Sequence, residues 1–235
     1  MGLIIKEGLI VSCQALKNEP LYGGDTIAKM ALAAMLGGAV AIRANTTKDI
    51  KKIYKKIDGK IPIIGLIKKD YSDSSVYITP TLSELKKLIS SECKVIAIDA
   101  TNRTRPHGEK LSDLIRYARD NSDKELMADI STLEEAEAAE KLGFDYISST
   151  MKGYTEDTKC NKIPDIVFLD SLFNGIKKST VIAEGGINSC EMLKRVLEIG
   201  YNRVVIGGAI TRPLTITKNF VSVFEPFDKK NANNY

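Results

Sequence analysis

The chain of 235 residues has no tryptophan, one histidine and four cysteines. The cysteines lie far apart and form no CxxC pair, so the sequence excludes a thiolate zinc centre and favours reduced thiols in a cytoplasmic protein. HExxH and EF-hand spacings are missing as well, and we expect no metal site built by the protein. The single histidine, His107, lies in the loop RTRPHGE, where we interpret it as a surface residue. A general base would then have to be a lysine or a carboxylate.

Long apolar runs and concentrated charge are missing too. The segment MGLIIKEGLIV carries Lys6 and Glu7 inside its apolar stretch, so we expect neither a signal peptide nor a membrane span. The net charge of +4 is small and spread along the chain. The densest lysines, in the string KKIYKK, have a helical spacing that indicates a solvated helix face. We therefore expect no nucleic acid and no membrane as a partner.

Eight short runs rich in isoleucine, valine and alanine recur along the chain. They are continuous rather than alternating, as expected for parallel strands that are covered on both faces. Amphipathic segments separate them, and no linker divides the series. The pattern predicts one α/β domain, a TIM (β/α)8 barrel over residues 1–228, followed by a flexible polar tail over residues 229–235. A doubly wound sheet is the alternative, but no GxGxxG motif follows the first run. The runs are LIVSCQA, AVAIRA, IPIIGLIK, KVIAIDA, LMADI, YISST, VIAEGG and RVVIGG.

Two helix starts carry capping signals. Ser131 and Glu134 stand at capping-box spacing before a segment that ends at Gly143, a residue suited to a helix C-terminus. Thr81 and Glu84 have the same spacing. The two motifs predict helices that begin just after Ser131 and just after Thr81.

The carboxyl ends of the predicted strands carry a set of polar residues. In a TIM barrel these ends meet at one face, and the active site lies there. Three carboxylates, one lysine and one arginine would converge at that face, which is a stronger signal than any of them alone. The positions are Gln14, Arg43, Lys68, Asp99, Asp129, Ser149 with Thr150, Glu184, and Gly207 with Gly208.

The last two predicted strands end in glycine pairs, within the strings EGGIN and IGGAITRP. TIM barrels frequently bind phosphate at this place, through glycine amides and a helix N-terminus. Arg212 adds a charged donor, and Pro213 suits the first position of a helix. Tight turns are the alternative explanation of the glycines. Because both pairs stand where the fold predicts a phosphate, we expect a phosphorylated small-molecule substrate bound by Gly185, Gly186, Gly207 and Gly208.

The string IPIIGLIKKDYSD runs from a buried strand into two lysines, Lys68 and Lys69. Side chains alternate along a strand, so we expect Lys68 to face the barrel mouth and Lys69 to face away. A free lysine has a pKa of about 10.4, and a base working at pH 7 needs a value lower by roughly three units. Burial and the cation Arg43 would lower the pKa of Lys68, whereas a tight pair with Glu184 would raise it. The alternative is that Lys68 only binds phosphate or pairs with Asp99.

Several strings, in this order along the chain, resemble the bacterial N-acetylmannosamine-6-phosphate 2-epimerase family from about Gly8 to Phe224. The most specific are SCQAL, DATNRTRP, ADIST and GGAITRP. The resemblance implies a TIM barrel that interconverts N-acetylmannosamine 6-phosphate and N-acetylglucosamine 6-phosphate in sialic acid degradation, with no redox cofactor.

The resemblance also implies roles for single residues. Lys68 would be the catalytic base and Glu184 a second acid/base group. Many members of the family have a basic residue where this chain has Gly186, which leaves backbone amides to bind the substrate at that position. The implied substrate contacts are Gln14, Arg43, Asp129 and Arg212.

In the implied reaction, neutral Lys68 removes the C2 proton of the open-chain sugar, and the proton returns to the opposite face. Arg43, the acid form of Glu184 or nearby amides would stabilise the enolate-like intermediate. Rival interpretations are a Schiff-base aldolase, an RNA-binding barrel and an inactive metabolite sensor. The even charge argues against RNA, and the presence of every required group argues against the sensor. The sequence leaves the oligomeric state open between monomer and homodimer.

Overall fold

The structure is a computed structural model that describes residues 2–15, 19–23, 25–159 and 162–224. The predicted tail over residues 229–235, its boundary at residue 228, and Cys160 lie outside the described residues.

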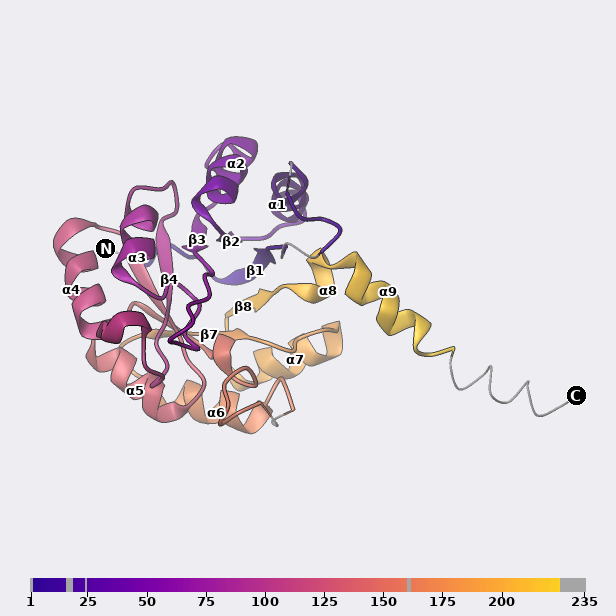
Figure 1. The fold of residues 1–235 in the computed structure, drawn as a ribbon. Helices are drawn as coiled ribbons and strands as arrows, with labels where there is room; N and C mark the ends of the chain where they lie inside the picture. Colours follow the sequence, from indigo (N-terminus) through magenta and orange to yellow (C-terminus); the bar gives the residue numbers. More distant parts are fainter. Residues whose placement is uncertain (1, 16–18, 24, 160–161, 225–235) are drawn as a thin grey trace, which may run out of the picture.

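Eight parallel strands form a closed barrel in which each strand pairs with its neighbours in sequence and β8 pairs with β1 (Figure 1). This confirms the predicted single TIM barrel. Each strand is shorter than, or shifted slightly from, the apolar run that predicted it, because the carboxyl ends of several runs continue into βα loops. The strands are β1 (Gly8–Cys13), β2 (Ala41–Asn45), β3 (Ile63–Leu66), β4 (Val95–Asp99), β5 (Glu125–Asp129), β6 (Tyr146–Ser148), β7 (Thr180–Glu184) and β8 (Arg203–Ile206).

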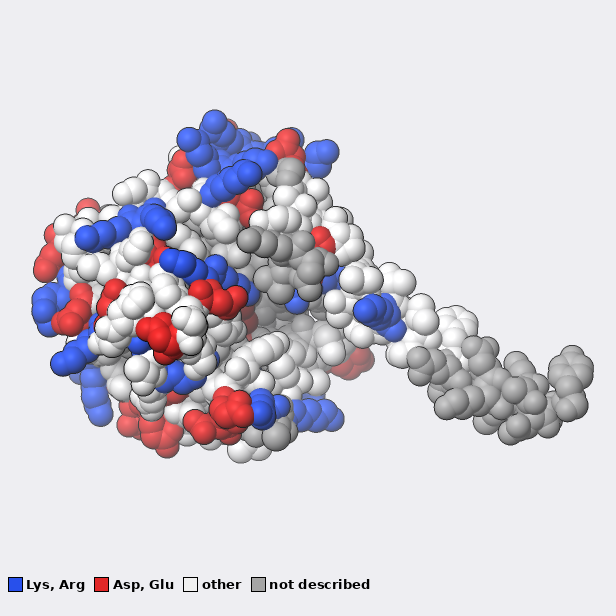
Figure 2. All heavy atoms as spheres, viewed as in Figure 1, with Lys and Arg blue, Asp and Glu red and all other residues white. Residues whose placement is uncertain are grey.

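Helices surround most of the barrel (Figure 1). The helix that contains the KKIYKK string buries Ile50, Ile53 and Ile57 and leaves its lysines at the surface, as predicted. Figure 2 shows lysines and arginines interspersed with carboxylates, with a dense basic cluster over this helix. The helices are α1 (Thr26–Leu36), α2 (Thr47–Ile57), α3 (Leu82–Ile89), α4 (Leu111–Asn121), α5 (Leu133–Lys141), α6 (Ile166–Gly175), α7 (Cys190–Ile199), α8 (Gly208–Thr211) and α9 (Pro213–Val221), with the 3₁₀ turns η1 (Pro106–Gly108) and η2 (Ser149–Met151).

The predicted capping box of α5 is wrong by one residue. Thr132, rather than Ser131, is the N-cap, and it exchanges hydrogen bonds with Glu135 rather than with Glu134. The buried carboxylate of Glu135 also accepts hydrogen bonds from the backbone and the side chain of Ser131. Thr81 caps α3 as expected, but its hydroxyl accepts from the amide of Ser83 and donates to the Glu84 carboxylate, so the predicted capping box with Glu84 takes a different form.

The N-terminal segment closes the end of the barrel opposite the strand carboxyl ends. Ile5 is fully buried among the interior side chains, and its amide donates to the Tyr146 hydroxyl at 3.1 Å. That hydroxyl donates in turn to Glu125, which also accepts from the amide of Ile4. Among the described residues, the interior is therefore a packed core at this end of the barrel.

The helix α9 runs away from the barrel instead of covering it (Figure 1). None of its residues is buried, although Leu214, Phe220 and Val221 are apolar and expose 47%, 70% and 55% of their surface. Within the described part of the chain, the helices are too short or too polar to cross a membrane.

Candidate active site

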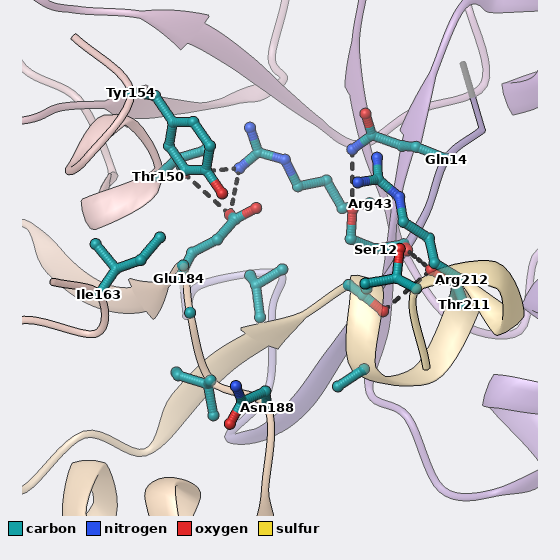
Figure 3. Close-up of a pocket in the computed structure, with 18 of the residues that line it drawn as sticks. Ser12, Gln14, Arg43, Thr150, Tyr154, Ile163, Glu184, Asn188, Thr211 and Arg212 are labelled. Atoms are coloured by element: carbon teal, nitrogen blue, oxygen red, sulfur yellow. Dashed lines mark hydrogen bonds and ion pairs between the residues drawn. The ribbon is translucent and has the colours of Figure 1, made fainter. Parts of the chain in front are cut away.

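A cavity of about 1,270 Å³ opens at the carboxyl ends of the strands (Figure 3). Most of the site residues expected from the sequence line it together. They are Gln14, Arg43, Lys68, Glu184, Gly185, Gly186, Gly207, Gly208 and Arg212. Thr150, listed from the sequence as a strand-end position, lines the cavity too. Other lining residues were not expected from the sequence; among them are Ser12, Tyr77, Tyr154 and Asn188.

Lys68 follows β3 and begins a short hairpin over the cavity. Its amide donates to the Asn45 side chain at 2.9 Å, and its backbone forms an antiparallel bridge with Ile78. The side chain is half-buried and lines the cavity. Lys69 points away, with 48% of its side chain exposed and its Nζ 2.6 Å from the Tyr71 hydroxyl. The expected orientation of the two lysines is confirmed.

The surroundings of Lys68 lower its pKa from the ordinary lysine value. Burial is the largest cause, and the positive charge of Arg43 is the next. Arg212 acts in the same direction, whereas the negative charges of Glu184 and Asp129 act against it. These are the two causes expected from the sequence, and together they favour the neutral amine that a base requires.

Arg43 lies across the barrel interior between two carboxylates. Its side chain is 1% exposed and binds Asp129 through both terminal nitrogens, at 3.0 and 2.5 Å. The nitrogen Nη1 also lies 2.7 Å from Oε2 of Glu184. Asp129 is fully buried and its carboxylate faces Arg43, so the sequence expectation of a sugar contact from Asp129 stays a prediction.

Glu184 ends β7 and faces the cavity with 14% of its side chain exposed. Burial raises its pKa above the ordinary glutamate value, Asp129 adds to the rise, and Arg43 opposes it. Ser149 fixes the backbone of Glu184: the Ser149 hydroxyl donates to its carbonyl oxygen at 2.8 Å and accepts from its amide at 2.9 Å. Glu184 is thus a held carboxyl that keeps its proton to higher pH than a free glutamate.

Gln14 contributes an amide with one unused end. Its Nε2 donates to the Ser12 hydroxyl at 2.9 Å, while its buried Oε1 has no hydrogen-bond partner among the described residues (Figure 3). A buried acceptor without a partner is costly, and a bound molecule with an N–H or O–H group would satisfy it. This geometry suits a substrate contact.

The glycine pairs bring backbone to the cavity wall. Gly186 has φ +72°, and a Cβ there would lie 2.4 Å from the carbonyl carbon of Ile163. In this conformation of the loop a side chain at Gly186 would clash with the backbone of Ile163, so glycine suits the position. The amides of Gly208 and Ala209 stand in the first turn of α8, where a helix leaves N–H groups without intrahelical acceptors.

Asp99, at the end of β4, and His107, in a loop, lie outside this site. Asp99 is fully buried and binds Arg103 at 2.6 Å and Thr101 at 2.7 Å, so it is not the partner of Lys68. His107 exposes 63% of its side chain beside Asp73, which confirms its interpretation as a surface residue.

The chain matches one known protein family over most of its length. Residues 27–225 match the model of NanE, described as "Putative N-acetylmannosamine-6-phosphate epimerase". The chain belongs to this family. The resemblance stated from the sequence motifs is confirmed.

Relatives in the NanE family cover nearly the full chain. A protein of Oceanobacillus iheyensis named "Putative N-acetylmannosamine-6-phosphate 2-epimerase" is 53% identical over 220 residues, which are 92% of this chain and 98% of the relative. A protein of the same name from Staphylococcus saprophyticus is 49% identical over 225 residues, covering 94% of this chain and all of the relative.

Solved structures agree on family and fold. The N-acetylmannosamine-6-phosphate 2-epimerase from Clostridium perfringens is 47% identical, with a TM-score of 0.89 over 94% of each chain. A thiamine phosphate pyrophosphorylase from Pyrococcus furiosus is 17% identical with a TM-score of 0.57, a likeness of fold alone. The NanE match includes every site residue predicted from the sequence except Gln14.

Proposed function

We propose that this chain interconverts N-acetylmannosamine 6-phosphate and N-acetylglucosamine 6-phosphate by inverting C2, without a cofactor, in sialic acid degradation. The observation that carries the proposal is Lys68. Its side chain lines the cavity, its pKa is lowered, and it stands beside the raised-pKa carboxyl of Glu184. Family membership supplies the substrate.

The proposed chemistry begins with the open-chain sugar. Neutral Lys68 takes the C2 proton, the C–H electron pair forms the C1–C2 double bond, and the aldehyde oxygen becomes an enolate oxygen. Glu184 in its acid form, together with Arg43, stabilises that oxygen. The proton then returns to the opposite face of C2, which leaves the atoms of the sugar unchanged and its configuration inverted.

The remaining polar groups of the cavity suit the two ends of the substrate. We propose that the amides of Gly185, Gly186, Gly207 and Gly208, with the guanidinium of Arg212, bind the phosphate. The unused amide oxygen of Gln14 is suited to an N–H or hydroxyl group of the sugar.

Proton NMR of N-acetylmannosamine 6-phosphate in heavy water tests the reaction. We expect the glucosamine epimer to appear with deuterium at C2, with and without EDTA. Lys68→Ala should reduce the rate by about a hundredfold to ten-thousandfold, because a general base contributes on the order of 10² to 10⁴ to the rate. Lys69→Ala is the matched control and should retain the wild-type rate, since Lys69 points away from the cavity.

Unchanged substrate with folded wild-type protein would refute the epimerase. A Schiff-base aldolase is the alternative that also needs a neutral lysine, and borohydride would trap its substrate on Lys68. No such adduct is expected from a proton-transfer base.

We also propose that the protein is a cytoplasmic homodimer. The exposed apolar side chains of α9, Leu214, Phe220 and Val221, favour a partner that covers them, and a second copy of the chain is that partner. Cys13 and Cys93 are buried free thiols, as suits a reducing compartment.

A further inference from the structure

Thr150, expected at the active-site face from its place at a strand end but given no specific role, lies at the centre of the polar cluster. It follows β6 in the turn η2, and its Oγ1 lies 2.8 Å from Asp129 Oδ1 and 3.0 Å from Glu184 Oε2 (Figure 3). The Ser148 hydroxyl is 2.8 Å away and Arg43 Nη1 is 3.3 Å away. Two carboxylates therefore share one hydroxyl.

A hydroxyl has one proton to donate and two lone pairs to accept with. When both carboxylates are ionised, Thr150 donates to only one of them. When Glu184 is protonated on Oε1, its Oε2 is still an acceptor for the Thr150 hydroxyl. Thr150 can therefore hold Oε2 in either protonation state of Glu184, and the proton on Oε1 can be donated to a bound molecule.

The contacts also distinguish the two oxygens of Glu184. Arg43, Thr150 and, more distantly, Ser148 all meet Oε2. No hydrogen bond from a described residue reaches Oε1, and the side chain lines the cavity. Oε1 is thus the oxygen left for a bound molecule.

We propose that Thr150 is a positioning residue for Glu184, holding Oε2 in both protonation states so that Oε1 stays available to the substrate. The proposal rests on the proposed function, in which Glu184 assists Lys68. The charged groups that face Glu184 are Arg43 from β2, Lys68 after β3 and Asp129 from β5. Thr150 is a neutral group that contacts both Asp129 and Arg43 as well as Glu184.

The test compares Thr150→Val, which keeps the shape and removes the hydroxyl, with Thr150→Ser, which keeps the hydroxyl. The Glu184 carboxyl is titrated by carbon-13 NMR of glutamate-labelled protein, with Glu184→Gln identifying its signal. We expect Thr150→Val to raise the Glu184 midpoint by about one unit, because a donor to the carboxylate is lost. We expect kcat to fall about tenfold with KM nearly unchanged, as for an interaction made mainly in the transition state. Thr150→Ser should restore both values.

Thr132→Val is the control for a general loss of stability. It removes the N-cap of α5 and should lower the melting temperature without moving the Glu184 midpoint. An unmoved midpoint in Thr150→Val, or a kcat loss that Thr150→Ser does not restore, overturns the proposal. If Thr150→Val does not fold, Thr150→Ala carries the same expectation. The titration needs no substrate, so it remains decisive even if the wild-type protein proves not to be an epimerase.

Discussion

Lys68 is a half-buried amine close to the cation Arg43, so holding a proton on its Nζ costs stability. The pKa of Lys68 is lower in the folded protein than the unfolded value of about 10.4. Above that pH, Lys68 therefore does not destabilise the fold. As the pH falls from about 10.4 to the folded pKa, the free energy of unfolding decreases. At pH 7 we expect Lys68→Met to raise the free energy of unfolding by about 1 kcal/mol while abolishing activity.

Urea unfolding at pH 7 and pH 9.5 checks this expectation. The gain from Lys68→Met should shrink at the higher pH, and Lys69→Met should show no gain because Lys69 is exposed. A destabilised Lys68→Met at both values of pH would contradict the account.

Single residues differ in how far the sequence predicts them. The inward direction of Lys68 follows from the two-residue period of a strand, which is local geometry. The roles of Ser149 and Thr150 could not be predicted from local geometry. They depend on the pairing of β6 with β7, which brings both hydroxyls to Glu184. The string ISST carried the only signal, hydroxyls at a strand end, and such strings are common.

Among the elements, the N-terminal segment makes a prediction of its own. The Tyr146 hydroxyl links the Ile5 amide to Glu125. We expect Tyr146→Phe to destabilise the fold by about 1 to 2 kcal/mol, since buried hydrogen bonds are lost, and to leave activity nearly unchanged at the opposite end. Hydrogen exchange should quicken at the Ile5 amide. Tyr201→Phe, which loses a buried bond to Leu169, is the control that should not affect Ile5.

The start of α5 shows where element prediction stops. The string STLEEAE contains two capping spacings, one from Ser131 to Glu134 and one from Thr132 to Glu135. Both satisfy the local rule. The structure uses the second because buried Glu135 also binds the amide of Asn102 from the neighbouring loop, a long-range contact that no local motif encodes.

At the scale of the whole molecule, the barrel was predictable and the course of α9 was not. Its sequence is that of an ordinary terminal helix, and only the structure shows that it leaves the barrel. We expect the wild-type protein to be a dimer by light scattering at about 50 µM, and Phe220→Asp with Val221→Asp to give monomers, because charge on an apolar contact is costly. Lys218→Glu, at an exposed polar position of the same helix, should remain dimeric. A monomeric wild-type protein would contradict the proposed homodimer.

Arg43, Asp129 and Glu184 form one ion-pair cluster, and they come from β2, β5 and β7 respectively. They therefore belong to both halves of the chain, with Arg43 in the first and Asp129 and Glu184 in the second. Either half alone holds an arginine without its carboxylates or carboxylates without their arginine, so neither can retain a weakened form of the site. We expect the site to form only when strands of both halves stand in one barrel, so a fragment that carries either half alone should be inactive.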